Sequence, residues 1–225
     1  MGKLTGKTAI ITGAAGGIGR ASAMRYHKGG AAVMCADIDG DAAEDTANHI
    51  GQLGGKAEAI KLDVTDREAV RKSLHDTIDA LGSLDVLFNN AGVGAGPGWE
   101  ATLKVNLDGV YNGLYYGCQA LAASDGGAVV STASLGGVVT FSFAPMAADP
   151  PPPPYGHSAY EASKAAVIQM TRQFAALYGR SGVRVNAVAP GWIATPLTRV
   201  LSEDETRRSY LTELYPLGRA GQPEE

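Results

Sequence analysis

The sequence predicts an α/β fold with a doubly wound parallel sheet, in a single domain over residues 1–225. Three observations support this prediction. Short apolar runs alternate with longer helical patterns along the chain. A glycine-rich turn follows the first apolar run directly. Polar candidate residues follow the ends of apolar runs, and sheets of this kind bind ligands at the carboxyl ends of their strands.

Each strand is expected where a short apolar run occurs, and each helix where helical periodicity follows that run. The runs at 8–12 and 31–36 are almost wholly apolar, as in strands buried on both faces. Glycine pairs at 29–30 and 54–55 end the first two helices. The strands are expected at 8–12, 31–36, 57–62, 84–89, 128–133 and 183–188, and the helices at 17–29, 41–53, 66–81, 99–123, 158–178 and 200–214.

Composition excludes several classes of protein. The net charge is -4 and the basic residues are scattered, so no nucleic-acid surface is expected. Cys35 and Cys118 lie outside any metal or redox spacing, which predicts two buried thiols, no metal site and a reducing compartment. The first strand begins at Thr8, and no uninterrupted apolar run reaches the ~18 residues of a membrane span. We therefore expect a cytoplasmic protein without a membrane partner.

A run of prolines at 150–154 interrupts the alternation of strands and helices. Consecutive prolines favour an extended polyproline conformation and exclude helix or central strand. We interpret residues 141–157 or thereabouts as a proline-rich surface insertion before the long helix. A docking site for a proline-binding module is the alternative interpretation.

The turn after the first strand has the pattern G-x-x-x-G-x-G, formed by Gly13, Gly17 and Gly19. Such a turn lets a dinucleotide pyrophosphate approach the backbone at the start of a helix, although glycine-rich turns also occur without a ligand. Asp37 follows the second strand, where a carboxylate accepts hydrogen bonds from an adenosine ribose and repels a 2′-phosphate. The neighbouring Ile38 offers no positive charge, so the sequence favours NAD over NADP. A solvated acid is the alternative reading of Asp37.

Tyr160 and Lys164 are four residues apart, and therefore share one face of the long helix. An ammonium near a phenol favours the phenolate, so we expect Lys164 to lower the pKa of Tyr160. Ser134 follows the fifth strand, where its hydroxyl could hold a substrate oxygen or bond its own turn. Asp63 follows the third strand and could cap the next segment or accept from an adenine amino group.

Five motifs in order make the chain resemble the short-chain dehydrogenase/reductase family over essentially all its length. They are Thr12-Gly13-x-x-x-Gly17-x-Gly19, Asn89-Asn90-Ala91-Gly92, Ser134-x-x-Gly137, Tyr160-x-x-x-Lys164 and Pro190-Gly191-Trp192-Ile193-Ala194-Thr195-Pro196. The resemblance implies a Rossmann-like sheet. It implies four catalytic residues: Tyr160 as general acid/base, Lys164 as its partner, Ser134 on the substrate oxygen, and Asn106 holding a relay water. The cofactor residues that it implies are Gly13, Gly17, Ile18, Gly19, Asp37, Ile38, Asp63, Val64, Asn90, Ala91, Gly92, Tyr160, Lys164, Pro190, Gly191, Ile193 and Thr195.

Three departures from the family pattern are visible. The interval between Asn89 and Asn106 is short, the interval between Ser134 and Tyr160 is about twice the usual length, and the family's final strand is missing. Residues 196–215 match the family's substrate lid. A set of candidate pocket residues suggests an apolar or cyclic substrate, although several of them could instead pack the core or the insertion: Phe141, Phe143, Met146, Tyr155, His157, Trp192, Leu197 and Leu201.

These observations predict an oxidoreductase that transfers a hydride between NAD(H) and a secondary alcohol or ketone. One alternative is an NAD-binding sensor or interaction protein without turnover. Another is an NADP-dependent carbonyl reductase, which Asp37 disfavours. The resemblance further implies a homodimer or homotetramer acting on a small-molecule substrate.

Overall fold

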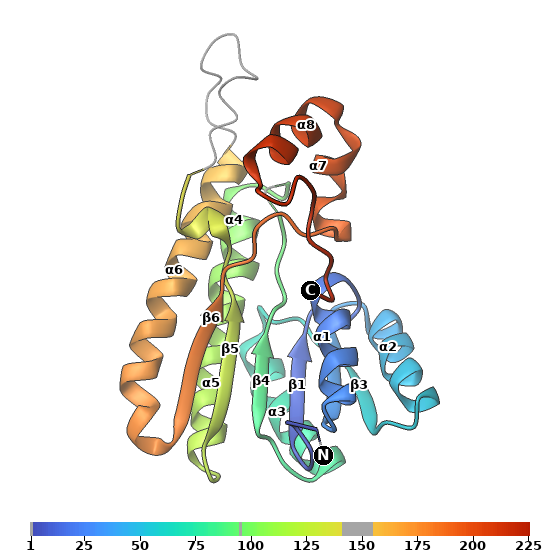
Figure 1. The fold of residues 1–225 in the computed structure, drawn as a ribbon. Helices are drawn as coiled ribbons and strands as arrows, with labels where there is room; N and C mark the ends of the chain where they lie inside the picture. The colour runs from blue at the N-terminus through green and yellow to red at the C-terminus, as the bar shows by residue number, and fades with distance from the viewer. Residues whose placement is uncertain (1, 95, 141–154) are drawn as a thin grey trace.

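The computed structural model describes residues 2–94, 96–140 and 155–225, and its centre is one parallel sheet (Figure 1). The strand order is β3-β2-β1-β4-β5-β6. The order reverses between β1 and β4, which is the doubly wound arrangement expected from the sequence. The strands are β1 (Thr8–Thr12), β2 (Ala32–Asp37), β3 (Ala57–Lys61), β4 (Val86–Asn89), β5 (Gly127–Thr132) and β6 (Val183–Val188).

Helices cover both faces of the sheet (Figure 1). One face packs against α1 (Gly17–Lys28) and α2 (Gly40–Gln52), through a cluster centred on Ile11, Val33 and Ile50. The opposite face carries a larger cluster, to which the remaining long helices contribute. Those helices are α3 (Arg67–Leu81), α5 (Val110–Ala122) and α6 (Tyr155–Tyr178). Burial on two faces explains why the centre of β1, between its two threonines, is apolar at every position.

Local signals fix the helix ends. The side chain of Asp39 accepts a hydrogen bond from the backbone N–H of Ala42 at the start of α2. Asp66 accepts from Glu68 and Ala69 at the start of α3, and such caps stabilise a helix by about 1 kcal/mol. The observed bounds differ from the predicted ones by one or two residues at most of these ends.

The helix predicted at 99–123 is three consecutive segments. They are α4 (Trp99–Leu103), the π-helical turn η1 (Lys104–Gly109) and α5. A π turn accommodates one extra residue within a helix and often occurs at functional sites. Helical periodicity did not predict this turn, because the i, i+3, i+4 pattern of apolar residues tolerates one inserted residue.

Except for a short turn before the amino end of β6, the remaining segments lie beyond the carboxyl ends of the strands. The segment predicted as a lid forms the 3₁₀ turn η5 (Pro196–Thr198) and the helices α7 (Arg199–Glu203) and α8 (Glu205–Leu214), above the sheet in Figure 1. Two further 3₁₀ turns are η2 (Leu135–Gly137) and η4 (Gly179–Ser181). The chain then returns, and Gly221 pairs with Ile193 in a parallel bridge. Within the described residues β6 is an edge strand, and its side chains alternate between buried and exposed over most of its length.

Most of the proline-rich insertion predicted at 141–157 lies outside the described residues, so the positions Phe141, Phe143 and Met146 do too. Of the described helices, none is long and apolar enough to span a membrane. The same part of the chain contains no group of three or more metal-ligating side chains that could hold an ion.

Candidate active site

Two cavities meet beyond the carboxyl ends of β4, β5 and β6. The smaller, of about 260 Å³, is lined by the glycine turn, Asp37 and the loops after β4 and β6. The larger, of about 710 Å³, lies below the lid. Ser134 and Tyr160 line both cavities. The arrangement suits a dinucleotide in the smaller cavity and a second molecule in the larger one.

The start of α1 is suited to a phosphate group. Its N-cap residue Gly16 provides no side-chain hydrogen bond, and the first turn holds no acidic residue. The free N–H groups and the helix dipole there favour an anion. By contrast, Asp39 and Asp66 satisfy the corresponding groups of α2 and α3. The residues present therefore fit a pyrophosphate at this end of the smaller cavity.

The three glycines of the turn have different structural roles. Gly13 and Gly17 line the smaller cavity and adopt positive φ angles of 71° and 50°. Gly19 does not line it, since it packs against the turn itself. A Cβ at Gly19 would stand 1.9 Å from the carbonyl oxygen of Gly13. Ile18 lines the cavity beside Gly17.

Asp37 is bonded at both carboxylate oxygens. Oδ2 accepts from the backbone N–H of Ala15 at 2.9 Å, and Oδ1 accepts from that of Asp39 at 3.1 Å. These bonds fix the carboxylate at the rim of the smaller cavity, so it is not simply a solvated acid. The side chain of Ile38 is 63% exposed and lies outside the cavity lining.

Asp63 and Val64 are not among the residues that line the smaller cavity. Asp63 accepts a hydrogen bond from the N–H of Thr65 at 2.9 Å, which caps its own turn. Val64 is 8% exposed and belongs to the core, and its carbonyl accepts from Asn112. The structure thus gives both residues a role in holding the loop after β3.

The loop after β4 is held by threonines that sequence reasoning did not assign to the site. Thr12 Oγ1 accepts from the N–H groups of Asn90 and Ala91 at 2.9 and 3.0 Å. The Asn90 side chain donates to the carbonyl of Thr12 and accepts from the Thr132 hydroxyl. Asn90, Ala91 and Gly92 consequently line the smaller cavity. Strand-end threonines next to the glycine and asparagine motifs were the available sequence signal.

The loop after β6 completes the smaller cavity. Pro190, Gly191, Ile193 and Thr195 all line it. Thr198, which was not predicted, accepts from the Thr195 N–H at 3.1 Å and donates to the Ile193 carbonyl. Backbone hydrogen bonds from Gly221 to Trp192 and from Ala194 to Gly221 hold the other side of this loop.

Lys164 is buried beneath Tyr160. Its side chain is among the buried residues, at 4% exposed, and its Nζ donates to the carbonyl of Thr132 at 2.8 Å. The Nζ also lies 5.7 Å from the centre of the Tyr160 ring. Loss of solvent around the ammonium lowers the pKa of Lys164 from 10.5 to about 8.

The predicted direction of the Tyr160 pKa is wrong for the site as the structure describes it. Burial of the phenol raises its pKa above 10.0, and a hydrogen bond with Ser134 offsets only part of that effect. The Ser134 oxygen also accepts from the Gly136 N–H at 3.1 Å. Tyr160 is therefore a protonated phenol near neutral pH.

Asn106 lies in the π-helical turn, fully buried, and outside the lining of both cavities. Its Oδ1 accepts from the N–H of Val93, and its Nδ2 donates to the carbonyl of Val93, both at 2.8 Å. These two bonds use one acceptor site and one donor of the amide and position Val93, which lines both cavities. The role of Asn106 in holding a relay water stays a prediction.

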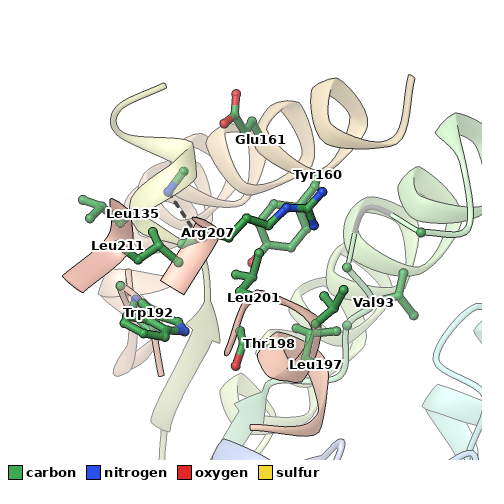
Figure 2. A pocket seen from close by; sticks show the side chains of 18 of the residues that line it. Val93, Leu135, Tyr160, Glu161, Trp192, Leu197, Thr198, Leu201, Arg207 and Leu211 are labelled. Atoms are coloured by element: carbon green, nitrogen blue, oxygen red, sulfur yellow. Dashed lines mark hydrogen bonds between the residues drawn. The ribbon is translucent and has the colours of Figure 1, made fainter. Parts of the chain in front are cut away.

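The larger cavity has mostly apolar walls (Figure 2). Trp192, Leu197 and Leu201, predicted as pocket residues, line it. The lid adds Arg207, Leu211 and Tyr215, which were not predicted as lining. Their spacing of three to four residues along and beyond α8 was the signal available in the sequence.

Comparison with known proteins identifies the family. The model of the short chain dehydrogenase family matches residues 7–206. The chain belongs to the short-chain dehydrogenase family. This short-chain dehydrogenase is 34% identical to the cyclohexanol dehydrogenase of Acinetobacter sp. (strain SE19), with 99% of this chain and 85% of the relative covered.

Solved structures of the family share the fold of this chain, and two of them hold a bound nucleotide. A putative gluconate 5-dehydrogenase from Beutenbergia cavernae with bound NADP superimposes with a TM-score of 0.84 at 34% identity, covering 98% of this chain and 86% of the other. A 7α-hydroxysteroid dehydrogenase in complex with NADH gives a TM-score of 0.85 at 29% identity, covering 98% and 84%. This short-chain dehydrogenase is thus a nucleotide-dependent oxidoreductase with a Rossmann-like sheet.

Proposed function

We propose that this short-chain dehydrogenase transfers a hydride between NAD(H) and a secondary alcohol or its ketone. The substrate is largely apolar, and cyclic alcohols are among the candidates. The observation that carries the proposal is the meeting of two cavities at Ser134 and Tyr160, above the buried Lys164. The likeness to a cyclohexanol dehydrogenase supports an alicyclic alcohol as the first substrate to test.

The cofactor would lie in the smaller cavity. The N–H groups at the start of α1 would hold its pyrophosphate, and the Asp37 carboxylate its adenosine ribose. The Asp37 carboxylate would repel the 2′-phosphate of NADP, and Ala14, Ala15 and Ile38 carry no positive charge that could bind it. Both observations favour NAD over NADP. When bound, NAD supplies the hydride acceptor; the residues below bind, orient and move the proton.

Tyr160 moves the proton between its phenol oxygen and the substrate oxygen. Ser134 accepts from the Gly136 N–H, so its own hydroxyl proton can be donated to the substrate oxygen. Lys164 is held in place by the Thr132 carbonyl and keeps its charge close to the phenol. Because burial raises the pKa of Tyr160, the phenol is protonated at neutral pH, and this is the form that can give a proton to a ketone oxygen.

The test is the formation of NADH from NAD with a panel of cyclic and open-chain secondary alcohols, in wild type and Tyr160→Phe. We expect turnover in wild type and a loss of about 10²-fold or more in the variant, because a general acid/base is removed. Calorimetry should show that the variant still binds NAD. Bound NAD without turnover of any alcohol would instead support the non-catalytic sensor, and faster turnover with NADP would support the carbonyl reductase.

The homodimer or homotetramer implied by the resemblance is also a proposal. Sedimentation of the purified protein would test it, and a monomer at working concentration would contradict it.

A further inference from the structure

We propose that the larger cavity binds the acidic group of its substrate through Arg207, so that the substrate is a hydroxy or oxo carboxylate with an apolar body. The inference rests on the proposed function, since it names the substrate class of the same site. It starts from an unusual pair of neighbours, Arg207 and Arg208, at the start of the lid helix α8.

The two arginines have different surroundings. The guanidinium of Arg208 forms a hydrogen-bonded ion pair with Glu205 one turn away. Arg207 lines the larger cavity instead, and Figure 2 shows its side chain extended from α8 on the same side as Tyr160. The two arginines are adjacent in the sequence, but only the side chain of Arg207 lines the cavity.

The charge of Arg207 is weakly compensated by the described residues. Its Nε lies 3.8 Å from Asp204 Oδ2, which is longer than a hydrogen bond. Asp204 already accepts from the Arg207 backbone N–H, as the cap of α8. Within residues 2–94, 96–140 and 155–225, no hydrogen bond joins a side-chain nitrogen of Arg207 to an acceptor. Its terminal nitrogens keep their bonding capacity for another group.

The rest of the cavity wall makes an anion the natural partner. The other charged residue of the lining is Glu161, and its carboxylate points away from the labelled cavity side chains in Figure 2. A second donor is Trp192, which is 7% exposed and whose buried Nε1 has no hydrogen-bond partner in the described part of the chain. Because the Trp192 Nε1 is inaccessible to solvent, Arg207 is the charged donor that a bound molecule would meet among the apolar walls.

Physical chemistry selects the carboxylate. A guanidinium binds a carboxylate through two parallel hydrogen bonds, and apolar surroundings strengthen that interaction. A wholly apolar substrate would displace water from Arg207 without forming a hydrogen bond to its guanidinium. The lost hydration would then oppose binding. The apolar surfaces of Leu197, Leu201 and Leu211 would meanwhile hold the body of the substrate between Arg207 and Tyr160.

The experiment compares one acid with its uncharged isostere. The substrates are 4-hydroxycyclohexanecarboxylate and 4-hydroxycyclohexanecarboxamide, assayed with NAD in wild type, Arg207→Gln, Arg207→Lys and the matched control Arg208→Gln. We expect wild type to prefer the acid by about 10- to 100-fold in kcat/KM, the range for a hydrogen-bonded charge. Arg207→Gln should bring the ratio near one, Arg207→Lys should keep part of it, and Arg208→Gln should keep all of it.

Salt and inhibitor binding provide readouts that a merely structural role would not change. The wild-type preference should shrink as NaCl is raised, because the Arg207 side chain is partly exposed and salt screens its charge. Calorimetry with NADH present should show tighter binding of cyclohexanecarboxylate than of cyclohexanecarboxamide, again lost in Arg207→Gln. Equal wild-type efficiency with acid and amide, or a ratio that Arg207→Gln leaves unchanged, would overturn the inference while the dehydrogenase stands. Acid binding that depends on Arg207, without turnover of any alcohol, would support the subsite and overturn the proposed function.

Discussion

Replacing Lys164 by methionine should make the protein more stable near neutral pH while removing its activity. The side chain is 4% exposed, and burial lowers its pKa from 10.5 to about 8. That difference corresponds to about 3 kcal/mol of destabilisation wherever the lysine is charged in both the folded and the unfolded protein. Methionine has no charge, so it removes this destabilisation, and its side chain fills a similar volume.

The substitution also has a cost. It leaves the Thr132 carbonyl without the Nζ donor at 2.8 Å, which costs about 1–2 kcal/mol. The net expectation at pH 7 is therefore a gain of about 1–2 kcal/mol in the free energy of unfolding, the balance of these two terms.

The sign of this difference should reverse with pH. Between about pH 8 and pH 10.5 the unfolded lysine binds more protons than the folded one, so wild-type stability rises with pH through that window. Above it both lysines are neutral, and the hydrogen bond to Thr132 then favours wild type. The two stability curves should cross between about pH 9 and pH 10.

The assay is urea unfolding of both proteins from pH 7 to pH 10.5. The contributions of Cys35 and Cys118, whose pKa values burial raises to about 12, are common to both proteins and cancel in the difference. Lys56→Met is the control, since Lys56 also donates to a backbone carbonyl, that of Leu81. A difference between wild type and Lys164→Met that stays constant over this pH range would refute the argument that burial of the charge dominates.

Further predictions follow from the same site. Gly19→Ala should cost at least about 2 kcal/mol by urea unfolding, because its Cβ would meet the Gly13 carbonyl at 1.9 Å, whereas Gly16→Ala, with no atom within 4 Å, should not; equal costs would contradict this. Asp37→Ala should lower the NAD over NADP ratio of kcat/KM by about tenfold or more, and an unchanged ratio would show that Asp37 only caps its turn. Alcohol oxidation should rise as pH increases above neutrality and ketone reduction should fall, because burial raises the pKa of Tyr160; steady-state pH profiles with the opposite slopes would refute that assignment.

For Asn106, the sequence indicated that the residue is important, and the structure shows which contacts it makes. The sequence, through its resemblance, marked the residue as important. In the structure Asn106 lies in a π-helical turn, and its side-chain amide forms hydrogen bonds with the backbone N–H and carbonyl of Val93. A turn of this kind depends on packing against other segments, here α6, which contacts both α4 and α5, and helical periodicity does not encode such packing.

The sequence by itself determined the sheet, the helix order, the glycine turn and the family, because these follow from local patterns: apolar runs, caps and ordered motifs. Tertiary structure decided the rest. It places Asp63 and Val64 outside the lining of the smaller cavity, raises the pKa of Tyr160 by burial where a lowered pKa was expected, and places Arg207 in the lining of the larger cavity. Each of these depends on burial and on contacts between distant segments, and therefore on where the folded chain excludes water.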